Sequence, residues 1–352
     1  MSLNIYNTAR VLFIGFIVSI LINSCKDSVN GPRSLQQNNG IYLYAGRIGG
    51  KQIYIVDTDS NKVIDSLTGF NSIKSLAITK GGQILYVTDG IANNNSEGII
   101  YSINSVTKAR SIISDRPGGI FIEPEGIPLI ISPIPNDTLS VVGTIDTVNN
   151  TISFFDTLNI YNYQSGNLIL TFDPTLPIFY TLTKSNKLYS YDYKNKRVLK
   201  YYNSIGIPFH NMKITPDGKY IYFAGGPVLE VAFDTVVAFL SSNYNASLAL
   251  SHDSKYLYMT DPGLPNTISS ARVYIYQTNT NKLVGSIDVS NNTVRESTNS
   301  IVLKSDGITA YVSDKLNTIF VINLNTQSVI TNVNLPNNSS SQLSIQLLLG
   351  SE

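Results

Sequence analysis

The amino-acid sequence predicts an all-β fold: a seven-bladed β-propeller with four antiparallel strands per blade and a ring closed by the C-terminal strand joining the first blade. Apolar stretches with alternating polar residues are joined by turns rich in Asp, Asn, Pro and Gly, as in β-hairpins. Two such hairpins make one unit, and seven units follow one another at intervals of 36 to 53 residues. This period, with four strands per unit, is typical of a β-propeller.

The composition agrees with this fold class and excludes one class of partner. The 352 residues include 22 Tyr and no Trp, and Ile, Val, Thr and Asn are frequent, which favours strands and tight turns. Lys and Arg number 25 against 24 Asp and Glu, so no field of one sign is expected to attract nucleic acid. We therefore expect no nucleic-acid partner. We also expect a monomer.

Residues 1–24 are predicted to be a signal peptide of the lipoprotein type. The apolar run at residues 11–22 follows Arg10 and would span about 18 Å as a helix, against about 30 Å for a bilayer core. That is the length of a signal-peptide apolar region. The segment LINSC resembles a bacterial lipobox, which implies that Cys25 is lipidated. A plain cleaved signal peptide with an incidental cysteine, or a short uncleaved anchor, are the alternatives.

Residues 25–39 then form the lipidated cysteine and a flexible polar tether, and the propeller domain occupies residues 40–352. Cys25 is the single cysteine, which excludes an intramolecular disulfide. We expect an exported protein that is lipid-anchored to the bacterial cell envelope, at the outer membrane. Lys26 and Asp27 resemble the surface-export signal of Bacteroidetes-type lipoproteins, and a periplasmic or surface orientation stays open.

The first hairpin of each unit is clearest in LAITKGGQILYVTD, at residues 76–89. Gapless matches in five other units lie at residues 120–133, 170–183, 212–225, 248–261 and 301–314. The turns TKGG, TPDG and KSDG supply residues that β-turns require. The position of the tyrosine in this hairpin defines a column with one member per unit: Tyr42, Tyr86, Ile130, Tyr180, Tyr222, Tyr258 and Tyr311.

The second hairpin of each unit follows after a loop of variable length, as in IYIVDTDSNKVIDSL at residues 53–67. Asp, Asn or Gln stands where its first strand meets the turn, because such side chains can accept a hydrogen bond from the backbone two residues on. DTDSNK superficially resembles a calcium loop. It has Lys62 where glycine is needed and Thr68 where glutamate is needed, so we reject a calcium site.

The two ends of the repeat region complement each other. The first unit begins at residue 41 with IYLYAG and lacks the strand that precedes this hairpin elsewhere, whereas LSIQLLLG at residues 343–350 follows the seventh unit. We expect this last segment to supply the missing innermost strand and so to remove an exposed sheet edge.

The strings LYVTD, with their IDxxTxKV-like followers, resemble those of YVTN-type propellers, also described as surface-layer-like or YncE-like, over residues 40–350. Kelch repeats do not fit, because the glycine pairs fall in four different columns, and WD40 repeats do not fit because their Trp is absent. The resemblance implies a seven-bladed propeller exported from the cytoplasm, with no single chemistry.

No catalytic set can be assigned from the sequence. The chain has two histidines, His210 and His252, and lacks the G-x-S-x-G motif, so neither a three-histidine metal site nor a familiar nucleophile is indicated. His252 stands in a turn column and is interpreted as an exposed turn residue. We expect no cofactor, no metal and no assigned catalytic residue.

The loops between the second and third strands of each blade should share one face, around the channel mouth, with the loops that enter the innermost strands. Loops on rigid scaffolds commonly carry function. The repeat places these polar residues near the mouth: Arg47, Lys51, Lys74, Asp89, Arg116, His210, Asp261, Arg295, Glu296, Asn299 and Asp314. The ligand-binding candidates among them are Arg47, Lys74, Asp89, Arg116, His210, Asp261, Arg295 and Asp314. Asp89, Asp261 and Asp314 share one column, and turn capping is the favoured interpretation for these three.

Two functions remain open on this basis. The first is a membrane-anchored extracytoplasmic propeller that binds an unidentified protein or small-molecule ligand, or serves as a scaffold, through its channel-mouth face without catalysis. The alternative is a cofactor-free propeller enzyme, lactonase-like or lyase-like, with a polar site at the channel mouth, because the fold hosts both kinds of function.

Overall fold

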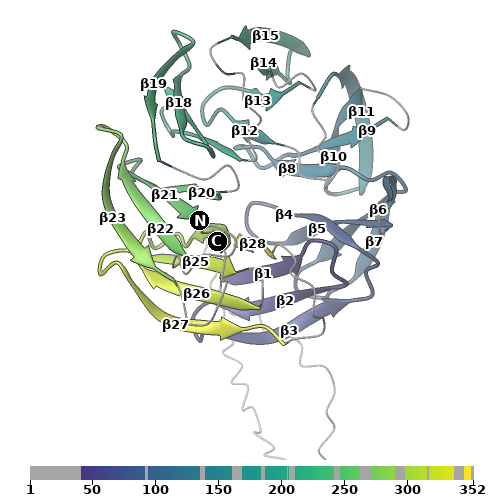
Figure 1. The fold of residues 1–352 in the computed structure, drawn as a ribbon. Helices are drawn as coiled ribbons and strands as arrows, with labels where there is room; N and C mark the ends of the chain where they lie inside the picture. The colour runs from purple at the N-terminus through teal and green to yellow at the C-terminus, as the bar shows by residue number, and fades with distance from the viewer. Residues whose placement is uncertain are drawn as a thin grey trace, which may run out of the picture. The chain divides into compact units, whose positions relative to one another are not determined.

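The computed structural model describes residues 41–91, 94–134, 139–160, 169–183, 187–203, 205, 211–241, 246–261, 271–289, 298–314, 317–336 and 345–349. These residues belong to one compact unit, Gln36–Glu352, and all of their regular elements are strands. The strands form seven four-stranded antiparallel sheets arranged as blades of a ring (Figure 1). The predicted seven-bladed β-propeller is confirmed.

Each blade runs outward from an innermost strand to an exposed outermost strand. Blades 1 to 4 are built from these strands: β28 (Ile345–Leu349), β1 (Tyr42–Arg47), β2 (Gln52–Asp57), β3 (Lys62–Thr68); β4 (Ile73–Ile78), β5 (Ile84–Ile91), β6 (Asn94–Asn104), β7 (Arg110–Ser114); β8 (Gly119–Ile122), β9 (Pro128–Pro133), β10 (Ser140–Asp146), β11 (Thr151–Leu158); β12 (Leu170–Phe172), β13 (Ile178–Leu182), β14 (Leu188–Asp192), β15 (Arg197–Tyr202). Blades 5 to 7 are built from these strands: β16 (Met212–Ile214), β17 (Tyr220–Phe223), β18 (Pro227–Glu230), β19 (Thr235–Phe239); β20 (Leu248–Leu250), β21 (Tyr256–Asp261), β22 (Arg272–Gln277), β23 (Lys282–Asp288); β24 (Thr298–Leu303), β25 (Thr309–Asp314), β26 (Thr318–Asn323), β27 (Ser328–Asn334).

The ring closes where the sequence predicts it. β28 is the innermost strand of blade 1 and pairs antiparallel with β1 over five residue pairs, from Leu43 opposite Leu349 to Arg47 opposite Ile345. β1 therefore has a hydrogen-bonded neighbour on both edges, β28 and β2. The inner edge of β1 is covered, as the sequence predicts.

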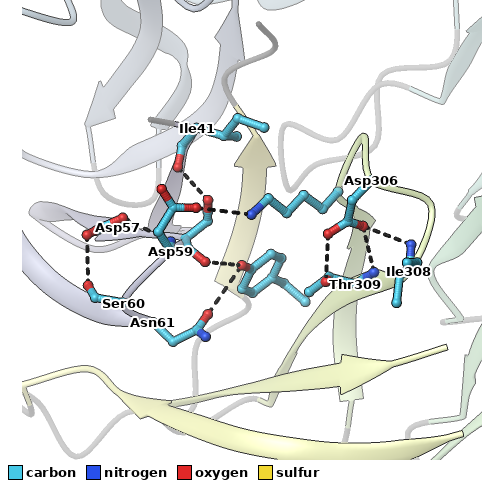
Figure 2. A network of polar contacts seen from close by, with 11 residues as sticks. Ile41, Asp57, Asp59, Ser60, Asn61, Asp306, Ile308 and Thr309 are labelled. Carbon is cyan, nitrogen blue, oxygen red and sulfur yellow. Dashed lines mark hydrogen bonds and ion pairs between the residues drawn. The ribbon is translucent and has the colours of Figure 1, made fainter. Parts of the chain in front are cut away.

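Side chains and turns of blades 7 and 1 add a polar seam beside this ladder (Figure 2). The Tyr311 hydroxyl donates toward the Thr58 carbonyl and the Asn61 side-chain oxygen, each at 3.3 Å. Lys304 Nζ lies 3.4 Å from a carboxylate oxygen of Asp59. Because Asp59 is exposed, this ion pair adds little, and the buried tyrosine contact carries most of the polar stabilisation.

Apolar side chains from neighbouring blades form the core. In one cluster, Tyr222 and Val228 of blade 5 pack with Leu257 and Met259 of blade 6. In strands such as β14 and β26 successive residues are buried on both faces, because each blade is covered by a neighbour on either side. Burial of apolar surface between blades is thus the main force that holds the ring together.

The outer hairpins share one turn geometry. The last turn residue adopts a left-handed backbone in all seven, with φ between 51° and 59°: Asn61, Lys108, Asn150, Lys196, Asp234, Asn281 and Gln327. Each corresponding pair of strands also contains one register shift. A β-bulge beside a left-handed residue is a common way to close a hairpin whose strands twist.

The predicted turn caps are present. Asp146 accepts hydrogen bonds from the Val148 and Asn149 amides, at 2.8 and 3.1 Å, and from the Asn149 side chain at 2.7 Å. These hydrogen bonds, the Asn149 side chain first, hold the pKa of Asp146 below its ordinary value. Asn323 accepts in the same way from the amides of Asn325 and Thr326.

Two members of the tyrosine column are wrong. In blade 2, Tyr86 pairs with Ser102, two residues before the turn residue Asn104. The equivalent position in blade 1 pairs with Ile55 and is Tyr44, not Tyr42.

In blade 3 the equivalent position is Leu129, opposite Thr144, and not Ile130. The cause is a first turn that is one residue shorter. Ile122 pairs with Pro128 there, whereas Ile78 pairs with Leu85 in blade 2. The gapless match across this turn therefore shifted the second strand by one residue.

Two tyrosines of this column, Tyr222 and Tyr311, form hydrogen bonds with the next blade, which gives a first testable prediction. Replacing Tyr311 by phenylalanine removes a donor to the turn of blade 1 and should lower the free energy of unfolding by about 1 kcal/mol. Tyr222 makes the same contacts with Thr278 and Asn281, at 3.2 and 3.0 Å, and Tyr222→Phe should behave alike.

Tyr86 provides the matched control, because its buried hydroxyl and the side-chain oxygen of Asn150 both lack a partner among the described residues. Tyr86→Phe should be neutral or stabilising. Chemical unfolding of the three variants measures the difference. An equal loss at Tyr86 and Tyr311 would show that the hydroxyl contacts do not contribute.

A second prediction concerns the tight turn between β17 and β18. Gly226 has φ of 109°, and a Cβ there would lie 2.2 Å from the Leu240 carbonyl oxygen. Gly226→Ala should cost about 3 kcal/mol or more, from backbone strain and the forced shift of Leu240. Gly81 has φ of 90°, and a Cβ added there would meet no atom within 4 Å, so Gly81→Ala should cost only about 1–2 kcal/mol. Thermal and chemical unfolding compare the two variants, and similar losses would contradict the prediction.

Candidate functional site

The channel-mouth face is built by the loops that follow the second strand of each blade and by those that enter the innermost strands. Arg47 is the last residue of β1 and is buried. Burial raises the pKa of Tyr54, and the nearby charge of Arg47 opposes this rise. Lys74 lies in β4 and extends across Gly90 of β5, where an added Cβ would be 2.6 Å from Lys74 Cε. Arg47 therefore lies near Tyr54 of blade 1, and Lys74 packs against Gly90 of blade 2.

Asp89 is a buried cap for the loop that enters blade 2. Its side chain is 2% exposed and its carboxylate accepts hydrogen bonds from the backbone amides of Asn71 and Ser72, at 2.7 to 2.9 Å. These amides belong to the loop that connects β3 to β4. The carboxylate thus fixes the path of the chain from blade 1 into blade 2.

The other two aspartates of this column use different partners. Asp314 is fully buried and accepts a hydrogen bond from the Thr318 amide at 2.9 Å, so it caps the loop after its own strand. Asp261 accepts a hydrogen bond from the Tyr274 side chain; burial and this contact raise the pKa of that tyrosine. All three carboxylates are engaged by the protein, and Asp89 and Asp314 accept hydrogen bonds from loop amides as the capping interpretation predicts.

Arg116 lies away from these residues. Its side chain is exposed and lines a cleft between the outermost strands β7 and β11, together with Ile113, Thr151 and Phe154. The structure therefore brings Arg47, Lys74 and Asp89 to the inner part of the face but leaves Arg116 near the rim. His210 and Arg295, like Cys25, lie outside the described residues.

The innermost strands carry a residue that sequence reasoning missed. The described strands β4, β8, β12, β16, β20, β24 and β28 contain two charged residues, Lys74 and Lys213, and no carboxylate. In the register of the blades, the position of Lys213 holds small, apolar or hydroxyl side chains elsewhere: Ala77, Phe121, Thr171, Ala249 and Val302. A charge in this otherwise uncharged column was the available signal.

Neither a metal site nor a membrane-spanning helix is found in the described part of the chain. No group of three or more His, Cys, Asp and Glu side chains is close enough there to hold a metal ion. The same residues contain no helix with the length and apolar character needed to cross a membrane.

Comparison with known proteins identifies the fold and no family. No family model and no curated protein matches the sequence. Among solved structures, a functionally unknown protein from Desulfotomaculum acetoxidans DSM 771 is similar, with 14% identity, a TM-score of 0.63, and coverage of 88% of this chain and 99% of that one.

Two enzymes are also similar in structure. Hydrazine synthase from Kuenenia stuttgartiensis has 14% identity and a TM-score of 0.56, over 72% of this chain and 77% of that one. Dihydro-heme d1 dehydrogenase NirN, solved in complex with DHE, has 13% identity and a TM-score of 0.55, over 87% of this chain and 66% of that one. At such identities the likeness shows the shared propeller fold alone.

Proposed function

We propose that this protein is an exported, lipid-anchored propeller of the YVTN type that binds a ligand or protein partner through its channel-mouth face, without catalysing a reaction. The observation that carries the proposal is a rigid closed ring with very unequal loops on that face. Residues 262–271 separate β21 from β22, whereas residues 224–226 suffice between β17 and β18. The β5–β6 hairpin on this face is also long, because its two strands stay paired as far as Ile91 and Asn94.

The aspartates of the repeated hairpin stabilise loops, so we assign ligand binding to the variable loops and not to the repeated hairpin itself. Asp89 and Asp314 are committed to backbone amides, so they hold loop shape. Variation in the loops can then change what is recognised without loss of the scaffold.

The binding proposal is tested by changing two lysines on the mouth face and by reversing the charge of one lysine on the opposite face. Lys51 is exposed between β1 and β2, and Lys255 is exposed in the turn between β20 and β21. The full-length protein in detergent is immobilised and screened against cell-surface proteins and small ligands.

Lys51→Glu combined with Lys74→Ala should weaken the saturable binding by about tenfold or more, equivalent to about 1.4 kcal/mol, and Lys255→Glu should not. Equal losses on both faces would overturn the assignment of the face. Turnover of a substrate in a hydrolase and lyase panel would overturn the non-catalytic role.

The anchor is tested separately. Cys25→Ser should move the protein from the membrane fraction to the soluble fraction and abolish labelling by a radioactive fatty acid, because the serine cannot carry the lipid. Ser28→Ala in the tether is the matched control and should remain in the membrane fraction. If Cys25→Ser stays with the membrane, an uncleaved helical anchor replaces the lipid in the proposal.

A further inference from the structure

The side chain of Lys213 emerges on the face of blade 5 that is turned away from blade 4. Its neighbours in β16, Met212 and Ile214, are buried in a cluster with blade 4 residues such as Tyr180. Successive residues of a strand point to opposite faces, so Lys213 shares its face with Tyr222, its partner across the ladder. Tyr222 packs toward blade 6.

Lys213 nevertheless reaches water. Its side chain is exposed, while Met212 and Ile214 on either side are buried. β16 is an innermost strand, and β17, β18 and β19 cover its outer edge. An exposed side chain on an innermost strand faces the central channel of a propeller, so Lys213 faces that channel.

No described residue supplies a countercharge to the ammonium group. None of the described residues forms an ion pair or hydrogen bond with the Lys213 side chain, and the described innermost strands contain no carboxylate. The surrounding protein desolvates the amine and lowers its pKa. An unpaired charge in such surroundings is unfavourable, and a bound anion would offset that cost.

A polar neighbour completes the setting. Asn211 precedes β16, and its carbonyl accepts a hydrogen bond from the Ala224 amide, which continues the ladder by one residue. Asn211 therefore lies two residues from Lys213 on the same face, one step nearer the mouth, and it is half-buried. An amide donor and an ammonium on one side of a strand suit the oxygens of a carboxylate or phosphate group.

We propose that the central channel binds a small anionic molecule whose carboxylate or phosphate group lies against Lys213 and Asn211. This inference rests on the proposed binding function and names the chemical class of the ligand. A ligand in the channel enters from the mouth, where Lys74 is the second cation of the innermost strands.

The first test measures the reactivity of Lys213 in the full-length protein in detergent. A neutral amine-reactive reagent is used, and peptide mass spectrometry quantifies the label on Lys213 and on Lys255. Lys213 should react at lower pH than Lys255, because the protein around the channel desolvates Lys213 and lowers its pKa, whereas Asp253 raises that of Lys255. The probes are inorganic phosphate and succinate, with trimethyl phosphate and succinamide as neutral analogues.

Phosphate, succinate or both should slow the labelling of Lys213 saturably, by about tenfold if the bound anion raises its pKa by one unit. Lys255 should not respond, which separates binding from salt screening, and the neutral analogues should have no effect. The anion that acts distinguishes a phosphate ligand from a carboxylate ligand. Labelling of Lys213 that responds to neither anion would overturn the inference.

Variants give the second test. Calorimetric titration with the active anion should show binding by the wild-type protein and by Lys213→Arg, which keeps the charge, and none by Lys213→Met. Lys255→Met serves as the matched control, and cooperative unfolding confirms that each variant is folded. Binding by Lys213→Met as tight as that of the wild type would overturn the inference. If partner binding depends on Lys51 and Lys74 but neither anion changes the labelling of Lys213, the proposed function stands. Only the proposed anion site in the channel is then wrong.

Discussion

A chain that ends at Pro336 is expected to lose cooperative folding, because it lacks β28. Without this strand, β1 loses five backbone pairs and presents a free edge, and the fully buried Leu43 and Ala45 lose the strand that pairs with them. β28 also packs against the neighbouring innermost strands β24 and β4. With net hydrogen-bond contributions of about 1 kcal/mol each and the lost apolar burial, we expect a loss on the order of 5 kcal/mol or more. That is comparable with the whole stability of many domains.

Circular dichroism with chemical unfolding, together with light scattering, measures this outcome. A chain that ends at Leu349 is the matched control and should unfold like the full-length protein. A synthetic peptide that contains residues 341–352 should partly restore the folding of the truncated chain, because a strand can be added in trans to an exposed edge. An unchanged unfolding midpoint after truncation at Pro336 would show that the ring does not depend on its closing strand.

Asp89→Ala is expected to produce the second largest effect, a loss of about 3–5 kcal/mol in the free energy of unfolding. The substitution leaves the amides of Asn71 and Ser72 without their acceptor and removes two charge-assisted hydrogen bonds from a site that is 2% exposed. Asp89→Asn keeps one oxygen and should lose about half as much.

Asp115→Ala, on an exposed residue of the next connecting loop, is the matched control and should stay within about 0.5 kcal/mol of the wild type. Chemical unfolding of all three variants measures the effects. If Asp89→Ala were as stable as the wild type but had lost binding to a partner, the carboxylate would be a ligand group instead of a cap.

The fold was predictable because its signals are local. Alternating apolar residues and turn residues such as Asp146 and Asn323 specify hairpins wherever they occur, and seven repeats specify the ring. The register of the strands within the blades was harder to predict. In β9 (Pro128–Pro133) nearly every residue is buried, so the sequence lacks the alternation that would show which face Leu129 or Ile130 occupies. Tyr42 and Tyr44 lie two residues apart, on the same face, and the pattern alone does not distinguish them.

The site was predicted less completely, for a different reason. The sequence shows which residues depart from their column, but it does not show whether an exposed position faces outside water or channel water. Lys213 lies in a strand of three residues and looks like any exposed residue of an alternating strand. The sequence indicates a turn cap at Asp89, and its carboxylate does cap backbone amides. These amides belong to the preceding connection, about 18 residues away, a distance that only the tertiary structure reveals.

The closing ladder also determines how the ring meets mechanical load. A pull transmitted through the N-terminal segment enters the propeller at residue 41, directly before β1. β1 is held by five residue pairs to β28 on one edge and by five to β2 on the other, so the force is shared between two ladders from the outset. If the proposed anchor holds the protein at residue 25, tension on residues 25–39 would therefore be carried first by the ladders that join β1 to β28 and β2.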